Sequence, residues 1–211
     1  MKKVGLIFVS ISALLLGACG NSTASEDGKL NIVTTFYPVY EFTKQVAGDE
    51  ANVDLLVKAG TEVHDYEPSA KDIARIQEAD VFVYENENME TWVHDVEESI
   101  DTSKVSVIRA TEGTLFLPGS EEGEDHDQSE EGHSHPYDPH VWLSPARAIT
   151  LVETIRDSLV AKYPEKKDTF ETNAAAYIEK LDALDMKYSE TLSATKQKYF
   201  VTQHTAFAYL A

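Results

Sequence analysis

Three histidines occupy distinctive positions in this 211-residue sequence and could together bind a metal ion. His64 lies in "GTEVHDYEPS", His140 in "DPHVWLSP" and His204 in "VTQHTAF". The chain around His140 is the most restrained, because a proline precedes it and a Trp-Leu pair follows it. Imidazole ligands suit zinc, copper, nickel and iron, whereas carboxylates suit magnesium and manganese. Three histidine ligands therefore favour Zn²⁺ as the bound ion.

The wide spacing of these histidines limits the kind of site they could form. A zinc finger is excluded, because its ligands occur in close pairs along the chain. Taken singly, His64 is typical of a solvated loop residue, and His140 is compatible with a packed structural histidine. Together, at loop and strand-end positions, the three indicate a pocket assembled by the fold.

The remaining histidines lie in different surroundings. Residues 118–135 are rich in acids and almost without apolar residues, so we expect a disordered loop there. Auxiliary metal capture and plain disorder are comparable interpretations for the histidines of this loop, which are His126, His133 and His135. His94 lies beside the apolar face of a predicted helix, and we expect its side chain to be exposed.

Apolar periodicity predicts an α/β fold for residues 30–145. Strands are expected near 30–36, 52–59, 80–85 and 105–111, and helices near 37–48, 67–79 and 92–100. Ser69, with Asp72 three residues later, is typical of a helix start. This alternation predicts an N-terminal (β/α)4 lobe with a parallel sheet. Ligands of such sheets bind beyond the carboxyl ends of the strands, where His64 would lie.

Residues 146–195 are predicted to form two helices, and the second, near 166–193, would be roughly 40 Å long. Such a helix could link two lobes, or it could pack along one lobe. Residues 196–211 contain "KYFVTQ" at 198–203, which we interpret as the first strand of a second α/β lobe, truncated in this chain.

The N-terminus is typical of an exported protein. Two lysines precede a short apolar run in residues 1–18, which we interpret as a signal peptide. "LGAC" ends at Cys19 and resembles a bacterial lipobox, in which the cysteine carries lipid. Cys19 is the single cysteine, so disulfides within the chain are excluded. We expect residues 19–29 to form a flexible tether on the extracellular face of the cell membrane.

The charge of the chain argues against one class of partner. Its 18 basic and 37 acidic residues give a formal net charge of −19. Such a surface repels phosphate backbones, so we expect no nucleic-acid binding. It also concentrates cations, although solubility alone accounts for most of these acids.

These motifs together resemble the metal-binding lipoproteins of ABC importers, in particular the zinc-specific branch of these solute-binding proteins. The resemblance depends on Cys19, "HDYEPS", "DPHVWLSP", "QHTAFAYL" and the acidic, histidine-rich loop. It implies two (β/α) lobes joined by a long helix, with the metal between them. It also implies three ligands in this chain, His64, His140 and His204, and a fourth from the second lobe, for which no position matches here. Manganese relatives carry a carboxylate at the position of His204.

We therefore expect zinc capture outside the cell by a monomer that delivers the ion to the permease and ATPase subunits of an ABC transporter, without enzymatic activity. Glu67 and Asp138 are candidate acceptors for the other ring nitrogens of the ligands. A manganese-binding importer component is one alternative. A zinc hydrolase is another, because three histidines with an open fourth position also form catalytic sites. A surface adhesin or scaffold with incidental histidines is the third.

Overall fold

The computed structural model describes residues 28–119, 137–197 and 199–211. Its centre is a four-stranded parallel sheet in the order β2-β1-β3-β4. The strands are β1 (Leu30–Thr34), β2 (Ala51–Leu55), β3 (Val81–Tyr84) and β4 (Ser106–Arg109). The predicted α/β lobe and its parallel sheet are confirmed.

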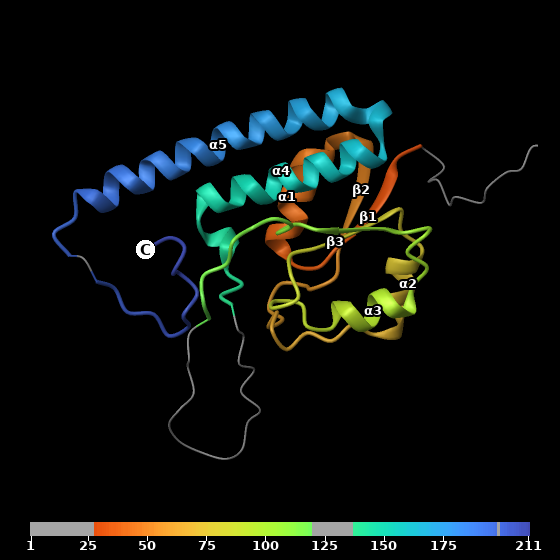
Figure 1. Cartoon of the computed structure of the whole chain (residues 1–211), viewed down its shortest axis with the longest axis horizontal. Helices are drawn as coiled ribbons and strands as arrows, with labels where there is room; N and C mark the ends of the chain where they lie inside the picture. The colour runs from red at the N-terminus through yellow and green to blue at the C-terminus, as the bar shows by residue number, and fades with distance from the viewer. Residues whose placement is uncertain (1–27, 120–136, 198) are drawn as a thin grey trace, which may run out of the picture.

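Two layers of helices enclose the sheet (Figure 1). The helices are α1 (Tyr37–Ala47), α2 (Ala70–Gln77), α3 (Val93–Ser99), α4 (Pro145–Lys162) and α5 (Lys167–Ser193). One face of the sheet packs on α1, α4 and α5, and the other packs on α2 and α3. Alternate strand residues supply the two cores: Ile32 belongs to the first and Val33 to the second. Because successive side chains point to opposite faces of a strand, apolar runs are expected in a sheet covered on both sides.

Local signals fix several helix ends. The Ser69 hydroxyl accepts a hydrogen bond from the Asp72 N–H, and the Asp72 carboxylate accepts one from the Ser69 N–H, which is the predicted capping box. Pro145 begins α4, where a missing N–H costs nothing. The inner face of α4 includes the fully buried residues Val152, Ile155 and Leu159.

Helix α5 is packed along only part of its length. Phe170, Ala174 and Leu181 are buried against the lobe. Beyond them Leu184, Met186 and Leu192 are exposed, at 41%, 60% and 46%. In Figure 1 this end of α5 extends past α4. No helix in the described ranges combines the length and apolar character needed to span a bilayer.

The C-terminal segment differs from the prediction. The expected strand at "KYFVTQ" is wrong, because the described residues from 196 onward contain turns and no strand. A strand needs a neighbour to pair its backbone N–H and C=O groups, and the described residues offer none here. The signal peptide, Cys19 and residues 120–135 of the acidic loop lie outside the described residues.

Candidate metal centre

Three loops bring His64, His140 and His204 together. The Nε2 atom of His140 lies 3.3 Å from Nε2 of His64 and 2.9 Å from Nε2 of His204. One nitrogen from each ring can be chosen so that all three lie within 4.8 Å of one another. His140 is buried, His64 is half-buried and His204 is exposed. The three therefore form a cluster with one face open to solvent.

The spacing of these nitrogens fits a zinc ion. Histidine nitrogens coordinate zinc at about 2.0–2.1 Å, so two tetrahedral ligands are about 3.3 Å apart. The His64–His140 separation matches that edge, and the His140–His204 separation is slightly shorter. A single lone pair on Nε2 of His140 cannot accept two good hydrogen bonds at once. A shared cation satisfies all three nitrogens better than hydrogen bonds among the rings.

Asp138 sets the orientation of the His140 ring. Its Oδ1 atom accepts hydrogen bonds from Nδ1 of His140 at 2.8 Å and from the His140 backbone N–H at 2.9 Å. Both residues are 6% exposed, so water competes weakly for these bonds. With its proton on Nδ1, His140 directs the Nε2 lone pair toward the other two histidines. Asp138 thus has the contact expected of it from the sequence.

The chain after His140 fixes this residue to the core. Val141 is fully buried, and the Trp142 ring meets the Phe36 ring edge-on at 5.0 Å. The next turn leads into α4 at Pro145. His140 therefore belongs to the rigid part of the lobe.

His64 is held by the loop between β2 and α2. The Tyr66 ring packs edge-on against Trp92 at 5.8 Å. Within α2, which follows the loop, Arg75 bonds to Asp54 of β2 at 2.9 Å and to Asp72 of the same helix at 3.3 Å. The Tyr66 contact ties the loop to the start of α3, and the Arg75–Asp54 contact ties together the two elements at the ends of the loop. His64 lies between them, with its Nε2 atom 3.3 Å from that of His140.

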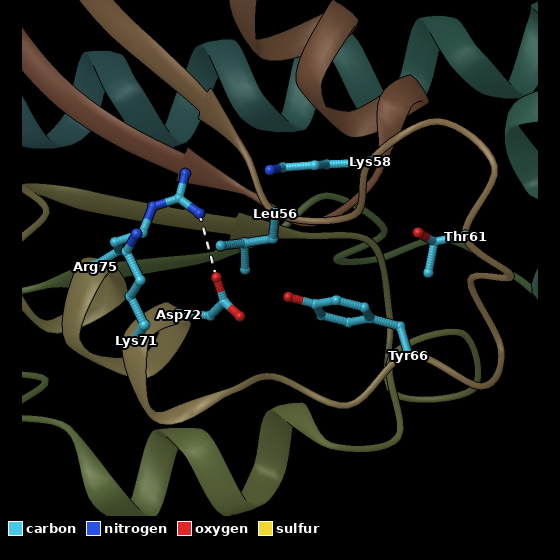
Figure 2. Close-up of a pocket in the computed structure, with 7 residues that line it drawn as sticks. All are labelled: Leu56, Lys58, Thr61, Tyr66, Lys71, Asp72 and Arg75. Carbon is cyan, nitrogen blue, oxygen red and sulfur yellow. Dashed lines mark hydrogen bonds and ion pairs between the residues drawn. The ribbon is translucent and has the colours of Figure 1, made fainter.

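The same loop borders a hollow of about 430 Å³. Figure 2 shows Tyr66 pointing toward Asp72 across this hollow, with Lys58 and Arg75 on its other sides. None of the three clustered histidines lines it, and Asp72 is its one carboxylate. The hollow is thus separate from the metal centre and lacks ligands suited to zinc.

Glu67 does not have the contact expected of it. Its side chain is exposed, and among the described residues no hydrogen bond joins it to a histidine ring. One residue earlier Tyr66 turns into the core, which leaves Glu67 facing solvent. His94 is exposed as predicted, at 73%, and pairs with Glu98 at 3.5 Å. His126, His133 and His135 lie outside the described residues.

The ZnuA family profile, described as the periplasmic component A of a zinc-uptake complex, matches residues 32–211. This chain belongs to the ZnuA family. It is 68% identical over 212 residues to the zinc-binding lipoprotein AdcA of Streptococcus pneumoniae, covering 100% of this chain and 42% of AdcA. It is 47% identical over 216 residues to the high-affinity zinc uptake system protein ZnuA of Bacillus subtilis, covering 100% of this chain and 68% of that protein.

A solved structure supports the same assignment. The crystal structure of Zn(II)-bound AdcA from Streptococcus pneumoniae matches with a TM-score of 0.78 and 67% identity. That match covers 87% of this chain and 37% of the AdcA chain. This ZnuA-family chain thus spans less than half the length of AdcA.

Behind the histidines lies a buried group of carboxyls that sequence reasoning missed. Glu85 follows β3 directly and is fully buried, as is nearby Glu90. The Glu90 carboxylate accepts three hydrogen bonds, from the Thr35 hydroxyl at 2.6 Å and from the backbone N–H groups of Glu85 and Asn86 at 2.9 and 3.0 Å. Glu85 accepts one, from the Asn86 side chain at 3.1 Å. The sequence does contain one signal for this group, which is the position of Glu85 directly after an apolar strand.

Of these two carboxyls, Glu85 is the one whose surroundings favour the protonated form. Burial, with the carboxyls of Glu90 and Asp138 nearby, raises the pKa of Glu85 well above its usual range. Burial also raises the pKa of Glu90, to about 7, although its three donors oppose the shift. Because Glu90 has more donors to stabilise its charged form, Glu85 is the neutral member of the pair.

Replacing Glu85 with glutamine should change how stability depends on pH. Below about pH 4.5 the unfolded glutamate is protonated too, so wild type and E85Q should be equally stable. As pH rises, the unfolded glutamate ionises while folded Glu85 keeps its proton, and wild type loses stability. E85Q cannot ionise and should melt higher at pH 7.5, by about 2–4 °C for each kcal/mol gained.

Thermal melts of metal-free protein at pH 4.5 and 7.5 test this, with the exposed Glu165→Gln as the matched control. An E85Q melting temperature below that of wild type at pH 7.5 would show that Glu85 is ionised in the folded protein.

Proposed function

We propose that this chain provides three ligands of a zinc-capture site, as part of a protein that binds zinc outside the cell. The observation that carries this proposal is the convergence of three distant histidines, with Nε2 of His140 3.3 and 2.9 Å from those of His64 and His204. The names of the relatives AdcA and ZnuA support zinc as the cargo. The open face of the cluster leaves room for a fourth ligand, a carboxylate or a water.

The compartment and partners follow from the same proposal. Cys19 carries lipid and holds the protein on the extracellular face of the membrane. An acyl anchor of at least two chains gives stable attachment, whereas one chain is marginal. The loaded protein, a monomer, then presents zinc to the permease of an ABC transporter, whose ATPase subunit drives transport.

Zinc is favoured over manganese by the ligand set. Imidazole nitrogens suit zinc, and the buried His140–Asp138 pair supplies a neutral ring with a directed lone pair. Competition titration of the chain with both metals tests the choice. The proposal expects zinc to displace manganese completely at equal concentration, and preferential manganese binding would contradict it.

The open face of the cluster also favours a second candidate, a zinc hydrolase, because catalytic zinc sites keep one position for water. Turnover of an activated ester by zinc-loaded protein, abolished in a His140→Ala variant, would support that alternative. The transport proposal expects no turnover above that of free zinc.

The acidic loop should affect zinc capture more than zinc affinity. We propose that His126, His133 and His135 collect zinc weakly and pass it to the cluster. Deleting residues 121–135 should leave the equilibrium zinc affinity within about twofold, because none of the three clustered ligands is lost. Uptake by cells at scarce zinc should slow.

Isothermal calorimetry and radioactive zinc uptake measure the two quantities separately. A control that replaces the loop with a Gly-Ser segment of equal length separates the loss of histidines from the change in chain length. A large affinity loss in both variants would show that the loop belongs to the main site.

A further inference from the structure

The hydroxyl of Tyr209 connects stretches of chain that are distant in the sequence. It donates a hydrogen bond to the backbone carbonyl of Asp138 at 2.7 Å and accepts one from the backbone N–H of Leu117 at 2.8 Å. The Asp138 N–H in turn donates to the Leu117 carbonyl at 3.0 Å. One phenol oxygen thus completes a small network two residues before His140.

The ring of Tyr209 is held as well as its hydroxyl. The Arg147 guanidinium, in the first turn of α4, lies 5.6 Å from the ring centroid. Arg147 also donates to the Leu115 carbonyl at 3.3 Å. Tyr209 packs at the edge of the core formed with α1, α4 and α5. The residue is therefore restrained from three sides.

Little of the segment that carries His204 is buried among the described residues. Among residues 199–211 only Ala206 is buried, while Tyr209 and Leu210 are half-buried. His204 itself is exposed. In Figure 1 the dark-blue C-terminal segment returns beside the chain that leads into α4. The position of His204 beside His140 thus depends on how firmly this short segment is attached.

We propose that Tyr209 is a positioning residue for the metal centre, and that its hydroxyl holds the His204 segment against the chain carrying Asp138 and His140. This inference rests on the proposed zinc function. A ligand that is in place only part of the time weakens the apparent affinity in proportion to that fraction. Tyr209 touches no metal ligand directly and acts through the backbone on either side.

The test is Tyr209→Phe, which removes the hydroxyl and keeps the ring. We expect the dissociation constant for zinc to rise about three- to tenfold, the effect of losing modest hydrogen bonds. Cobalt(II) binds similar sites, and its visible absorption reports coordination number. The cobalt spectrum of Tyr209→Phe should move toward that of His204→Ala. Hydrogen exchange at the Leu117 amide should become faster.

Tyr163→Phe is the matched control, because Tyr163 is half-buried and follows the far end of α4, about 27 Å along the helix from the centre. It should leave zinc affinity and the cobalt spectrum unchanged. Arg147→Gln removes the guanidinium that lies against the Tyr209 ring. It should change zinc affinity and the cobalt spectrum in the same direction as Tyr209→Phe, but by a smaller amount. It provides the same test if Tyr209→Phe does not fold.

If Tyr209→Phe had the same zinc affinity, cobalt spectrum and Leu117 exchange rate as wild type, the inference would be overturned. The proposed zinc centre would be unaffected by that result. A His204→Ala variant that binds zinc as tightly as wild type would contradict the centre itself, and the inference with it. The two failures are therefore distinguishable from one set of titrations.

Discussion

Replacing His140 with alanine should weaken zinc binding by about 100- to 1000-fold. Structural zinc sites contribute about 10–16 kcal/mol through four ligands, so each ligand accounts for roughly two to three powers of ten in affinity. His140 is the central member of the cluster, because both short contacts between the histidines include its Nε2 atom. Its removal also leaves buried Asp138 without its ring partner. Competition titration with a zinc chelator measures the change.

His94→Ala is the matched control for this prediction. It removes an imidazole that is 73% exposed and pairs with Glu98 on the surface of α3. Its zinc affinity should equal that of wild type within about twofold. If His94→Ala and His140→Ala weakened zinc binding equally, the metal would be bound by scattered surface histidines.

Replacing Asp138 with asparagine should weaken zinc binding by about 10- to 100-fold, as is usual for a carboxylate that orients a metal-bound histidine. The amide oxygen can still accept hydrogen bonds from the His140 ring and backbone N–H, but the neutral side chain no longer stabilises the positive charge that the ring gains on binding zinc. An asparagine can also turn its NH₂ group toward Nδ1, which favours the tautomer with the lone pair on the wrong nitrogen. The folded structure should survive, since the side chains are nearly isosteric.

The control here is Asp101→Asn, which alters a carboxylate that bonds to Ser103 at the surface and has no contact with the cluster. Circular dichroism should be unchanged in both variants. Zinc affinity for Asp138→Asn within twofold of wild type would mean that the His140–Asp138 contact is structural and does not tune the ligand.

The parallel sheet and the capped helix at Ser69 could be predicted because their signals are local. An apolar strand such as Val81–Tyr84 and a serine three residues before an aspartate depend little on distant parts of the chain. His140 could be predicted as a site residue for the same reason, because a proline and a tryptophan close to it in the sequence restrain the chain. The chain belongs to the ZnuA family, as the motifs around the three histidines suggested.

Long-range contacts could not be predicted in this way. Nothing near Tyr209 in the sequence indicates that its hydroxyl reaches Leu117 and Asp138. Glu85 was assigned to a strand end, but its burial and its closeness to Glu90 and Asp138, which together raise its pKa, arise only when the lobe folds. The strand expected at 198–203 has suitable residues, but the described part of the chain offers it no neighbouring strand. Only the folded arrangement of the lobe reveals that.

The most direct test of the central claim is an anomalous-difference map at the zinc edge from crystals of the zinc-loaded protein. We predict one strong peak about 2.0–2.1 Å from a ring nitrogen of each of His64, His140 and His204. A peak bound to residues of the acidic loop, or one that leaves any of these three rings uncoordinated, would contradict the account.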